Sequence, residues 1–176
     1  MILNIRPEQE TDFLIIFQLI KSAFLEMPYS SHTEQFLVEK LRKTDAYIPE
    51  LALVAEHEDK IVGYIILTKI HIAQGDKQLK ALSLGPVAVW PELHHRGIGT
   101  QLINRAHEVA HQLGHQRVIL LGHKDYYPRF GYERTDKYGI EMPFESAPEN
   151  CMVLGLTEDA LDNAAGKVIY SKPFLE

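Results

Sequence analysis

Cysteine is almost absent from this 176-residue sequence, in which Cys151 is the single copy. One thiol cannot form an internal disulfide, which excludes a disulfide-stabilised scaffold and is typical of a protein from a reducing cytoplasm. Basic residues are also outnumbered, since 18 Lys and Arg against 24 Asp and Glu give a formal net charge of −6. This balance argues against general binding to nucleic acid or to anionic membranes, because both reward an excess of positive charge.

Long hydrophobic runs are missing as well. No apolar segment reaches the ~20 residues of a membrane-spanning helix, and the first residues lack the basic segment and apolar core of a secretory signal. We therefore expect a cytoplasmic protein without membrane association. The 45% hydrophobic content is enough for a sizeable core, and no internal repeat, low-complexity tract or long linker divides the sequence. These features favour one globular domain over residues 1–176.

The first half of the sequence predicts a short strand, two helices and a β-hairpin. Residues 1–5 read as the strand, which ends at Pro7. Apolar residues at helical spacing predict helices over about 8–24 and about 31–42, and Ser31 with Glu34 resembles a capping box at the start of the second helix. Residues 51–55 and 61–67 then change to a strand pattern around a polar turn, which indicates the hairpin.

The second half predicts a strand, helix and strand in succession. A third strand covers about 79–89 and contains Gly85-Pro86, where we expect a bulge or a sheet edge because proline supplies no N–H to the ladder. A helix then extends to Gly114, and its predicted apolar face consists of Ile98, Leu102, Ala106, Val109, Ala110 and Leu113.

A strand over residues 117–121 follows this helix. The right-handed crossover rule predicts that residues 87–89 and 118–121 lie parallel. A helical turn near 125–129 and late strands near 139–142 and 152–156 complete the expected architecture. It is an α/β fold of the α+β type, with a mixed, mostly antiparallel sheet flanked by helices and one parallel pair splayed by a bulge.

The most informative segment is the basic glycine turn between the third strand and the long helix, His94-His95-Arg96-Gly97-Ile98-Gly99-Thr100. The first N–H groups of a helix have no intrahelical partner and the helix dipole is positive there, so such a turn can bind phosphate or pyrophosphate. Gly97 and Gly99 allow close approach to the backbone, and Arg96 adds a fixed positive charge. The turn therefore predicts a site for a phosphate-bearing ligand.

Two motifs together resemble the GNAT superfamily of N-acetyltransferases. The turn is similar to the family signature Gln/Arg-x-x-Gly-x-Gly/Ala, and Tyr126-Tyr127-Pro128-Arg129-Phe130-Gly131-Tyr132 is similar to its Phe-Tyr-x-x-x-Gly-Phe segment. The runs 84–89 and 120–123, with the Tyr-Tyr pair, further resemble the YhbS-like bacterial branch. One departure is visible, because His94 stands where the family has Gln or Arg.

The resemblance implies an enzyme that moves an acetyl group from acetyl-CoA to a primary amine by direct attack in a ternary complex, without a metal. Acetyl-CoA would be the co-substrate, and a small-molecule or peptide amine would be the acceptor. Dimers are common in the family, so a homodimer is one option, although nothing in the sequence specifies an interface. The pantetheine arm would contact Val87, Ala88 and Val89 where the parallel strands splay after Pro86. The pyrophosphate would be held by His94, His95, Arg96, Gly97, Ile98, Gly99 and Thr100.

Tyr127 is the catalytic residue that the resemblance implies, because it aligns with the family tyrosine four residues before the glycine. A phenol can give a proton to the departing CoA thiolate. The alternative is that Tyr126 and Tyr127 are ordinary packing aromatics. No residue is implied in the same way as the general base. Some GNAT enzymes place a glutamate on the strand before the signature, but residues 79–84 hold no carboxylate. Three titratable groups in nearby strands or loops stay open as alternatives, as does a water chain; the groups are Glu56, His71 and His123.

A competing motif lies inside the long helix, where His107-Glu108-Val109-Ala110-His111 matches the zinc-protease pattern His-Glu-x-x-His. Arg117 stands where the longer form of that pattern needs its third ligand. His107 and His111 are also expected to lie away from the apolar face of a helix that the first interpretation needs as a crossover. We therefore disfavour zinc hydrolysis.

Three further patterns bear on the alternatives to acetyl transfer. The glycine turn lacks the third glycine of a dinucleotide fingerprint and the lysine of a Walker A loop. Cys151 precedes Met152-Val153-Leu154, an apolar context that indicates a structural role. The missing base keeps one alternative open, a non-catalytic acyl-CoA-binding or regulatory protein.

Overall fold

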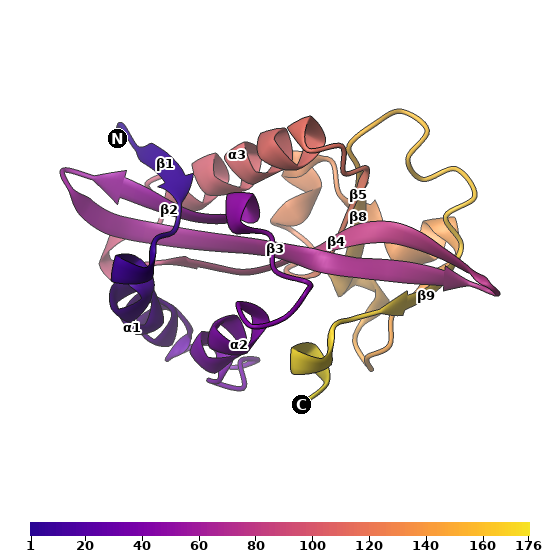
Figure 1. Ribbon diagram of the computed structural model, residues 1–176, viewed down its shortest axis with the longest axis horizontal. Helices are drawn as coiled ribbons and strands as arrows, with labels where there is room; N and C mark the ends of the chain where they lie inside the picture. Colours follow the sequence, from indigo (N-terminus) through magenta and orange to yellow (C-terminus); the bar gives the residue numbers. More distant parts are fainter. The chain divides into compact units, whose positions relative to one another are not determined.

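The computed structural model describes residues 1–176 and contains three α-helices and nine β-strands (Figure 1). The helices are α1 (Phe13–Phe24), α2 (Glu34–Leu41) and α3 (Ile98–Gln112). The strands are β1 (Asn4–Pro7), β2 (Ala52–His57), β3 (Lys60–Gln74), β4 (Lys77–Val89), β5 (Arg117–Leu121), β6 (Glu133–Arg134), β7 (Ile140–Glu141), β8 (Cys151–Gly155) and β9 (Gly166–Ile169). No helix has the length and apolar character needed to cross a membrane.

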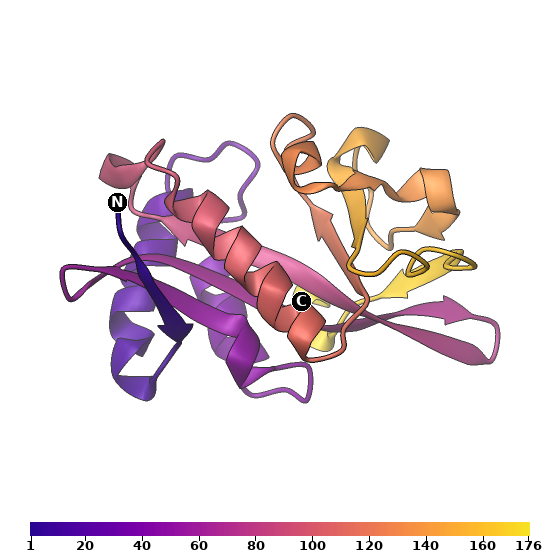
Figure 2. The ribbon, with the colours of Figure 1, turned by 90° about the horizontal axis from the view of Figure 1, so that it is seen from above.

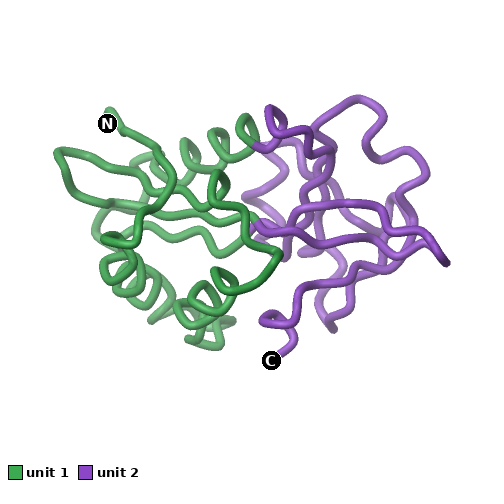
Figure 3. The backbone as a smooth tube through the Cα atoms, in the orientation of Figure 1, with its two compact units in different colours: residues 1–67, 85–109 green, residues 68–84, 110–176 purple.

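The chain forms two compact units, one of residues Met1–Leu67 and Gly85–Val109 and the other of Thr68–Leu84 and Ala110–Glu176 (Figure 3). Hydrogen bonds join the strands in the order β1-β2-β3-β4-β5-β8-β6, and β9 pairs with β3 and β7. The sheet is mixed and mostly antiparallel, as expected from the sequence.

The first unit contains the predicted hairpin. Strand β2 pairs antiparallel with β3, and the turn residues Glu58 and Asp59 both have positive φ, 49° and 59°, which is the type I′ geometry of tight hairpins. Strand β1 adds antiparallel to β2, with Asn4 opposite Glu56. Within this unit, α1 and α2 lie on one face of the strands and α3 on the other (Figures 1 and 2). The buried residues of α1 and α2 are Ile16, Leu19, Ile20, Ala23, Val38 and Leu41, together with the polar Gln35.

Two details of this unit differ from the prediction. Helix α1 begins at Phe13 rather than near residue 8, because a separate 3-10 turn over Glu10–Asp12 precedes it. The N-cap of α2 is Thr33, and no side chain caps it, so the capping box at Ser31 is wrong. The Ser31 hydroxyl instead hydrogen bonds to the hydroxyl of Thr33, 2.7 Å away.

The second unit contains the parallel pair of β4 and β5, with Leu82 opposite Val118 and Ser83 opposite Ile119. The parallel direction is confirmed, but the ladder lies before Gly85-Pro86 rather than at residues 87–89. Gly85 has φ 135° and is joined to Pro86 by a cis peptide bond, so the irregularity falls where a bulge was expected. The edge alternative also agrees with the ladder, because β4 has no paired residue on its β5 side beyond Ser83.

The late strands surround a core of their own in the second unit. Strand β8 pairs antiparallel with β5 and β6, and β9 pairs antiparallel with β3. Strands β7 and β9 form a second, two-residue parallel pair, which the sequence did not predict. The apolar core here is a cluster of Ile70, Ile72, Ala81, Ile119, Ile140, Val153, Ala164, Val168 and Tyr170.

The end of α3 agrees with the glycine signal. Gly114 has φ 88°, its N–H donates to the His111 carbonyl (3.0 Å), and the N–H of His115 donates to the Ala110 carbonyl (3.0 Å). One member of the predicted apolar face is wrong, since Leu113 is 46% exposed. The helix has already ended there, and Ile103 is buried instead.

Candidate functional site

The glycine turn forms the start of α3 in the first unit. Trp90 fixes its approach, because the indole N–H donates to the Ile61 carbonyl (2.9 Å). His95 and Gly97 have positive φ, 64° and 77°. The first i to i−4 bond of the helix runs from the Gln101 N–H to the Gly97 carbonyl (3.1 Å). The N–H groups at the next three positions, Ile98, Gly99 and Thr100, therefore have no intrahelical partner.

The space in front of this turn is open. A Cβ built on Gly97 would meet no atom within 4 Å. Arg96 is exposed and makes no ion pair, and His95 is exposed beside it. Unpartnered N–H groups, a positive helix end and a free guanidinium therefore border the same open space, which is the arrangement that an anion needs.

His94 has a different environment from its neighbours. Its imidazole Nε2 donates to the carbonyl of Val89, 3.1 Å away, and its ring meets that of His95 at 6.3 Å between centroids. The His94 side chain thus joins the turn to the end of β4. This contact was missed by the sequence reasoning, because no local pattern signals a bond across five residues of irregular chain.

The end of β4 alternates between the two faces of its strand. Ala88 is buried, whereas Val87 and Val89 are half-buried. Beside them, a Cβ on Gly63 would come within 2.9 Å of side-chain atoms of Ile98 and Leu102 and 3.3 Å of the Ala88 carbonyl. Gly63 therefore lets α3 pack closely on the strands that precede the turn.

In the second unit, β4 and β5 part after a short ladder. Their parallel pairing ends at Ser83 and Ile119, before the Gly85-Pro86 irregularity. Leu120 and Leu121 continue β5 and pair only with Met152 and Cys151 of β8. Their backbone groups on the β4 side are thus left without a strand partner.

The second motif forms an aromatic cluster in the same unit. Tyr127 lies in a 3-10 turn over Tyr127–Phe130, with ring centroids 5.1 Å from Tyr126 and 5.8 Å from Tyr132. Its ring covers Gly122 so closely that a Cβ at Gly122 would overlap ring carbons. Burial raises the pKa of the Tyr127 phenol to about 12, and the nearby Tyr126 adds to this. The phenol is therefore neutral and holds its proton at any physiological pH.

The candidate bases are placed differently. Glu56 accepts hydrogen bonds from Arg6 (2.7 Å) and Asn4 (3.0 Å), and the Arg6 guanidinium lowers its pKa, so it is occupied in joining β1 to β2. His71 is half-buried on β3. His123 is exposed and its Nδ1 accepts the N–H of Asp125 (3.2 Å). None of the three has the unpaired, buried setting of a tuned base.

The zinc-protease pattern lies on α3 without forming a metal site. No group of three or more His, Cys, Asp and Glu side chains is arranged to hold a metal ion. His111 is exposed, but His107 is partly buried, and burial lowers its pKa to about 4. The expectation that His107 lies away from the buried surface is therefore wrong. Cys151 is buried, with its sulfur 3.1 Å from the Ser146 hydroxyl.

Comparison with known proteins identifies the family. The model of the GNAT acetyltransferase domain matches residues 4–135. The chain is 39% identical over 125 residues to the N-acetyltransferase YjhQ of Escherichia coli K12, which covers 69% of this chain and 68% of that protein. It is 26% identical over 152 residues to E. coli YhbS, covering 86% of this chain and 89% of YhbS.

Solved structures give the same result for the fold. The structure of E. coli YhbS in complex with CoA matches with a TM-score of 0.88 and 25% identity, over 99% of this chain and 92% of that chain. A GNAT family acetyltransferase from Brucella melitensis in complex with acetyl-CoA matches with a TM-score of 0.81 and 29% identity, over 98% of both chains. The expected resemblance, including the YhbS-like branch, is confirmed. Because the family model spans most of the sequence and a relative at 39% identity agrees with it, the chain belongs to the GNAT family of acetyltransferases.

Proposed function

We propose that the protein transfers the acetyl group of acetyl-CoA to a primary amine by direct attack in a ternary complex. The observation that carries this proposal is the open glycine turn, in which unpartnered N–H groups at the start of α3 meet the free Arg96 side chain. Family membership supports it, as do the relatives crystallised with CoA and acetyl-CoA.

The cofactor would bind along the end of β4 and the start of α3. Val87, Ala88 and Val89 would contact the pantetheine arm. The backbone N–H groups of residues 97–100 would bind the pyrophosphate, with Arg96 and His95 supplying positive charge and a ring donor. His94 would position the turn, because its ring donates a hydrogen bond to the Val89 carbonyl. This assigns the residues of the site as His94, His95, Arg96, Gly97, Ile98, Gly99 and Thr100.

The reaction would proceed by attack of the neutral amine nitrogen on the thioester carbonyl carbon. The C–N bond forms, the C–S bond breaks, and the amine loses one proton to water. Tyr127 would donate its phenolic hydrogen toward the departing sulfur. Because its pKa of about 12 lies above the ~8.5 of a thiol, a hydrogen bond to the thiolate is favoured over complete transfer, and water supplies the final proton.

The test of the cofactor site is a pair of matched glycine substitutions. Gly97 and Gly75 both have positive φ, 77° and 59°, and neither would place a Cβ within 4 Å of another atom. Gly97→Ala should weaken acetyl-CoA binding at least tenfold in calorimetry, because the strained turn can no longer present its N–H groups. Gly75→Ala carries similar strain in the β3–β4 turn and should bind acetyl-CoA normally. Equal binding by both variants would refute the proposed site.

A second candidate function is a binding protein that holds acyl-CoA without efficient turnover. It is favoured by the absence of a carboxylate from residues 79–84 and by the ion pair that occupies Glu56. Thiol release measured over polyamines, aminoglycosides, amino acids and peptides separates the two. Binding of acetyl-CoA with no release on any amine would favour the binding protein.

A further inference from the structure

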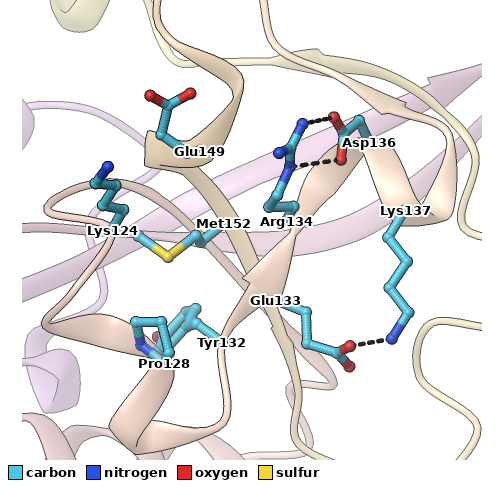
Figure 4. A pocket seen from close by; sticks show the side chains of 9 residues that line it. All are labelled: Lys124, Pro128, Tyr132, Glu133, Arg134, Asp136, Lys137, Glu149 and Met152. Atoms are coloured by element: carbon cyan, nitrogen blue, oxygen red, sulfur yellow. Dashed lines mark hydrogen bonds and ion pairs between the residues drawn. The ribbon is translucent and has the colours of Figure 1, made fainter.

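A pocket of about 420 Å³ opens in the second unit, beside the aromatic cluster (Figure 4). Its volume lies within the range of ~300–1,000 Å³ that is usual for small-molecule sites. Tyr132 connects the two features, because it lines the pocket and its ring lies 5.8 Å from that of Tyr127.

The apolar part of the pocket is formed by Pro128, Tyr132 and Met152. Tyr132 and Met152 are almost fully buried, with 3% and 1% of their surface exposed. Met152 lies on β8 between two paired neighbours, opposite Leu120 of β5 and opposite Arg134 of β6. Because the β8 backbone is paired on both sides, the buried floor of the pocket is fixed before any ligand arrives, and Pro128 is its exposed apolar residue.

The charged part of the pocket contains three cations and three anions, and four of these groups are already paired. Arg134 binds Asp136 through two hydrogen bonds, and Lys137 binds Glu133. The remaining two are Lys124 and Glu149, which make no hydrogen bond or ion pair, although the Glu149 charge helps to raise the pKa of the nearby Arg134 guanidinium. Figure 4 shows both at the same side of the pocket, above Met152.

We propose that this pocket binds a small zwitterion, namely an α-amino acid with an apolar side chain. Its carboxylate would pair with Lys124, its ammonium group with Glu149, and its side chain would lie against the exposed ring of Pro128, above the buried Met152. A ligand with one charge would satisfy one of the two free groups and place its charge near the other, of like sign. A zwitterion satisfies both, and so it is the class that fits two unpaired charges of opposite sign over an apolar surface.

The test uses leucine and two derivatives that each lack one charge. Leucine methyl ester keeps only the ammonium group, and N-acetylleucine keeps only the carboxylate. In calorimetry we expect leucine to saturate the protein with a Kd of about 1 mM, as suits so small a ligand in an open site. Each derivative should bind at least tenfold more weakly. The readout is binding, so the result does not depend on whether the protein transfers acetyl groups.

Two substitutions assign the charges. Lys124→Gln should weaken leucine about tenfold and leave the methyl ester unchanged, whereas Glu149→Gln should weaken leucine and leave N-acetylleucine unchanged. Lys77→Gln, an exposed lysine at the start of β4, is the matched control and should bind leucine normally. The proposal is overturned if leucine does not saturate below about 10 mM, if the three compounds bind equally, or if neither variant changes leucine binding.

Discussion

The ring of Tyr127 packs directly against the backbone of Gly122. Its ring occupies the space where Gly122 would place a Cβ, and Tyr126, Phe130 and Tyr132 surround it at centroid distances of 5.1 to 6.4 Å. These rings pack around the Tyr127 ring, and burial raises the pKa of its phenol to about 12. A fixed, neutral hydrogen-bond donor is what stabilises charge that develops on a leaving group.

Tyr127→Phe removes this donor and keeps the ring. If the phenol assists the leaving thiolate, kcat should fall by about 10- to 100-fold while the KM for acetyl-CoA changes less than twofold. Tyr126→Phe is the control, because it removes a neighbouring hydroxyl from the same cluster and should leave kcat within twofold. Unchanged turnover in Tyr127→Phe would remove Tyr127 from the mechanism.

His107 makes a separate prediction about acid stability. Burial lowers its pKa from 6.5 to about 4, so the folded protein holds it neutral while the unfolded chain protonates it near 6.5. The unfolded state therefore gains protons first, and stability should decline as pH falls from 6.5 toward 4, by about 1–3 kcal/mol from this residue. His107→Gln should flatten that decline in urea unfolding, and His111→Gln, at an exposed position, should not.

At the scale of elements, local sequence signals predicted the long helix and the hairpin correctly. They did not predict the short strands or the register between strands. The start and end of α3 follow from the glycine turn and Gly114, and the β2–β3 hairpin follows from a polar turn between apolar runs. Strands β6 and β9 were not predicted, because Glu133-Arg134 contains no apolar residue and Gly166–Ile169 contains only two. The β4–β5 ladder was placed too late, since the sequence shows direction but not register.

In the candidate site, too, contiguous motifs could be found in the sequence, and contacts between irregular segments could not. The sequence located the turn and the tyrosine because both are contiguous motifs, and their roles in binding and catalysis stay predictions. The His94 bond to Val89 and the dependence of Tyr127 on Gly122 could not be predicted, because they depend on how irregular segments fold back. The pocket around Met152 collects residues from segments up to 28 positions apart along the chain, from Lys124 to Met152.

Helix α2 is attached to the rest of the first unit by a buried ion pair that no sequence pattern signals. Arg42 follows the helix and donates to both carboxylate oxygens of Glu8, at 3.0 and 2.7 Å, while the Tyr47 hydroxyl donates to the same carboxylate at 2.7 Å. The Glu8 side chain is only 1% exposed. Burial has removed water from the Glu8 carboxylate, and the hydrogen bonds from Arg42 and Tyr47 compensate for that loss.

Arg42→Met should therefore destabilise the protein by about 3–5 kcal/mol in urea unfolding, because it leaves the Glu8 charge buried and without its cation. Adding Glu8→Gln to that variant should recover part of the loss, since the uncompensated charge disappears. Arg105→Met is the control, because it breaks an exposed pair with Glu108 that contributes at most about 0.5 kcal/mol. A loss in Arg42→Met no larger than in the control would contradict this account.

At the scale of the whole molecule, the ionisable groups whose pKa values change on folding define the pH range of stability. The Arg6 guanidinium lowers the pKa values of Asp12 and Glu56, so their contribution is present above about pH 4 and is lost as pH falls below it. Buried tyrosine phenols determine the stability at alkaline pH. Burial raises the pKa values of Tyr64, Tyr127, Tyr132 and Tyr170 above their usual range.

A raised phenol pKa means that the unfolded chain releases its proton first on alkaline titration. The stability from each such group is complete below about pH 10 and is lost as pH rises through 10 toward the folded pKa. Wild-type Tm should therefore drop steeply between about pH 10 and 11.5.

Tyr64 is the residue for the test, because its side chain is fully buried and its pKa is raised by burial first and by the nearby Glu8 carboxylate second. Tyr64→Phe should match wild type at pH 8 and lose less Tm at pH 11. Tyr29→Phe, at a fully exposed position, should follow wild type throughout, and identical alkaline losses in all three proteins would show that the Tyr64 phenol does not limit stability.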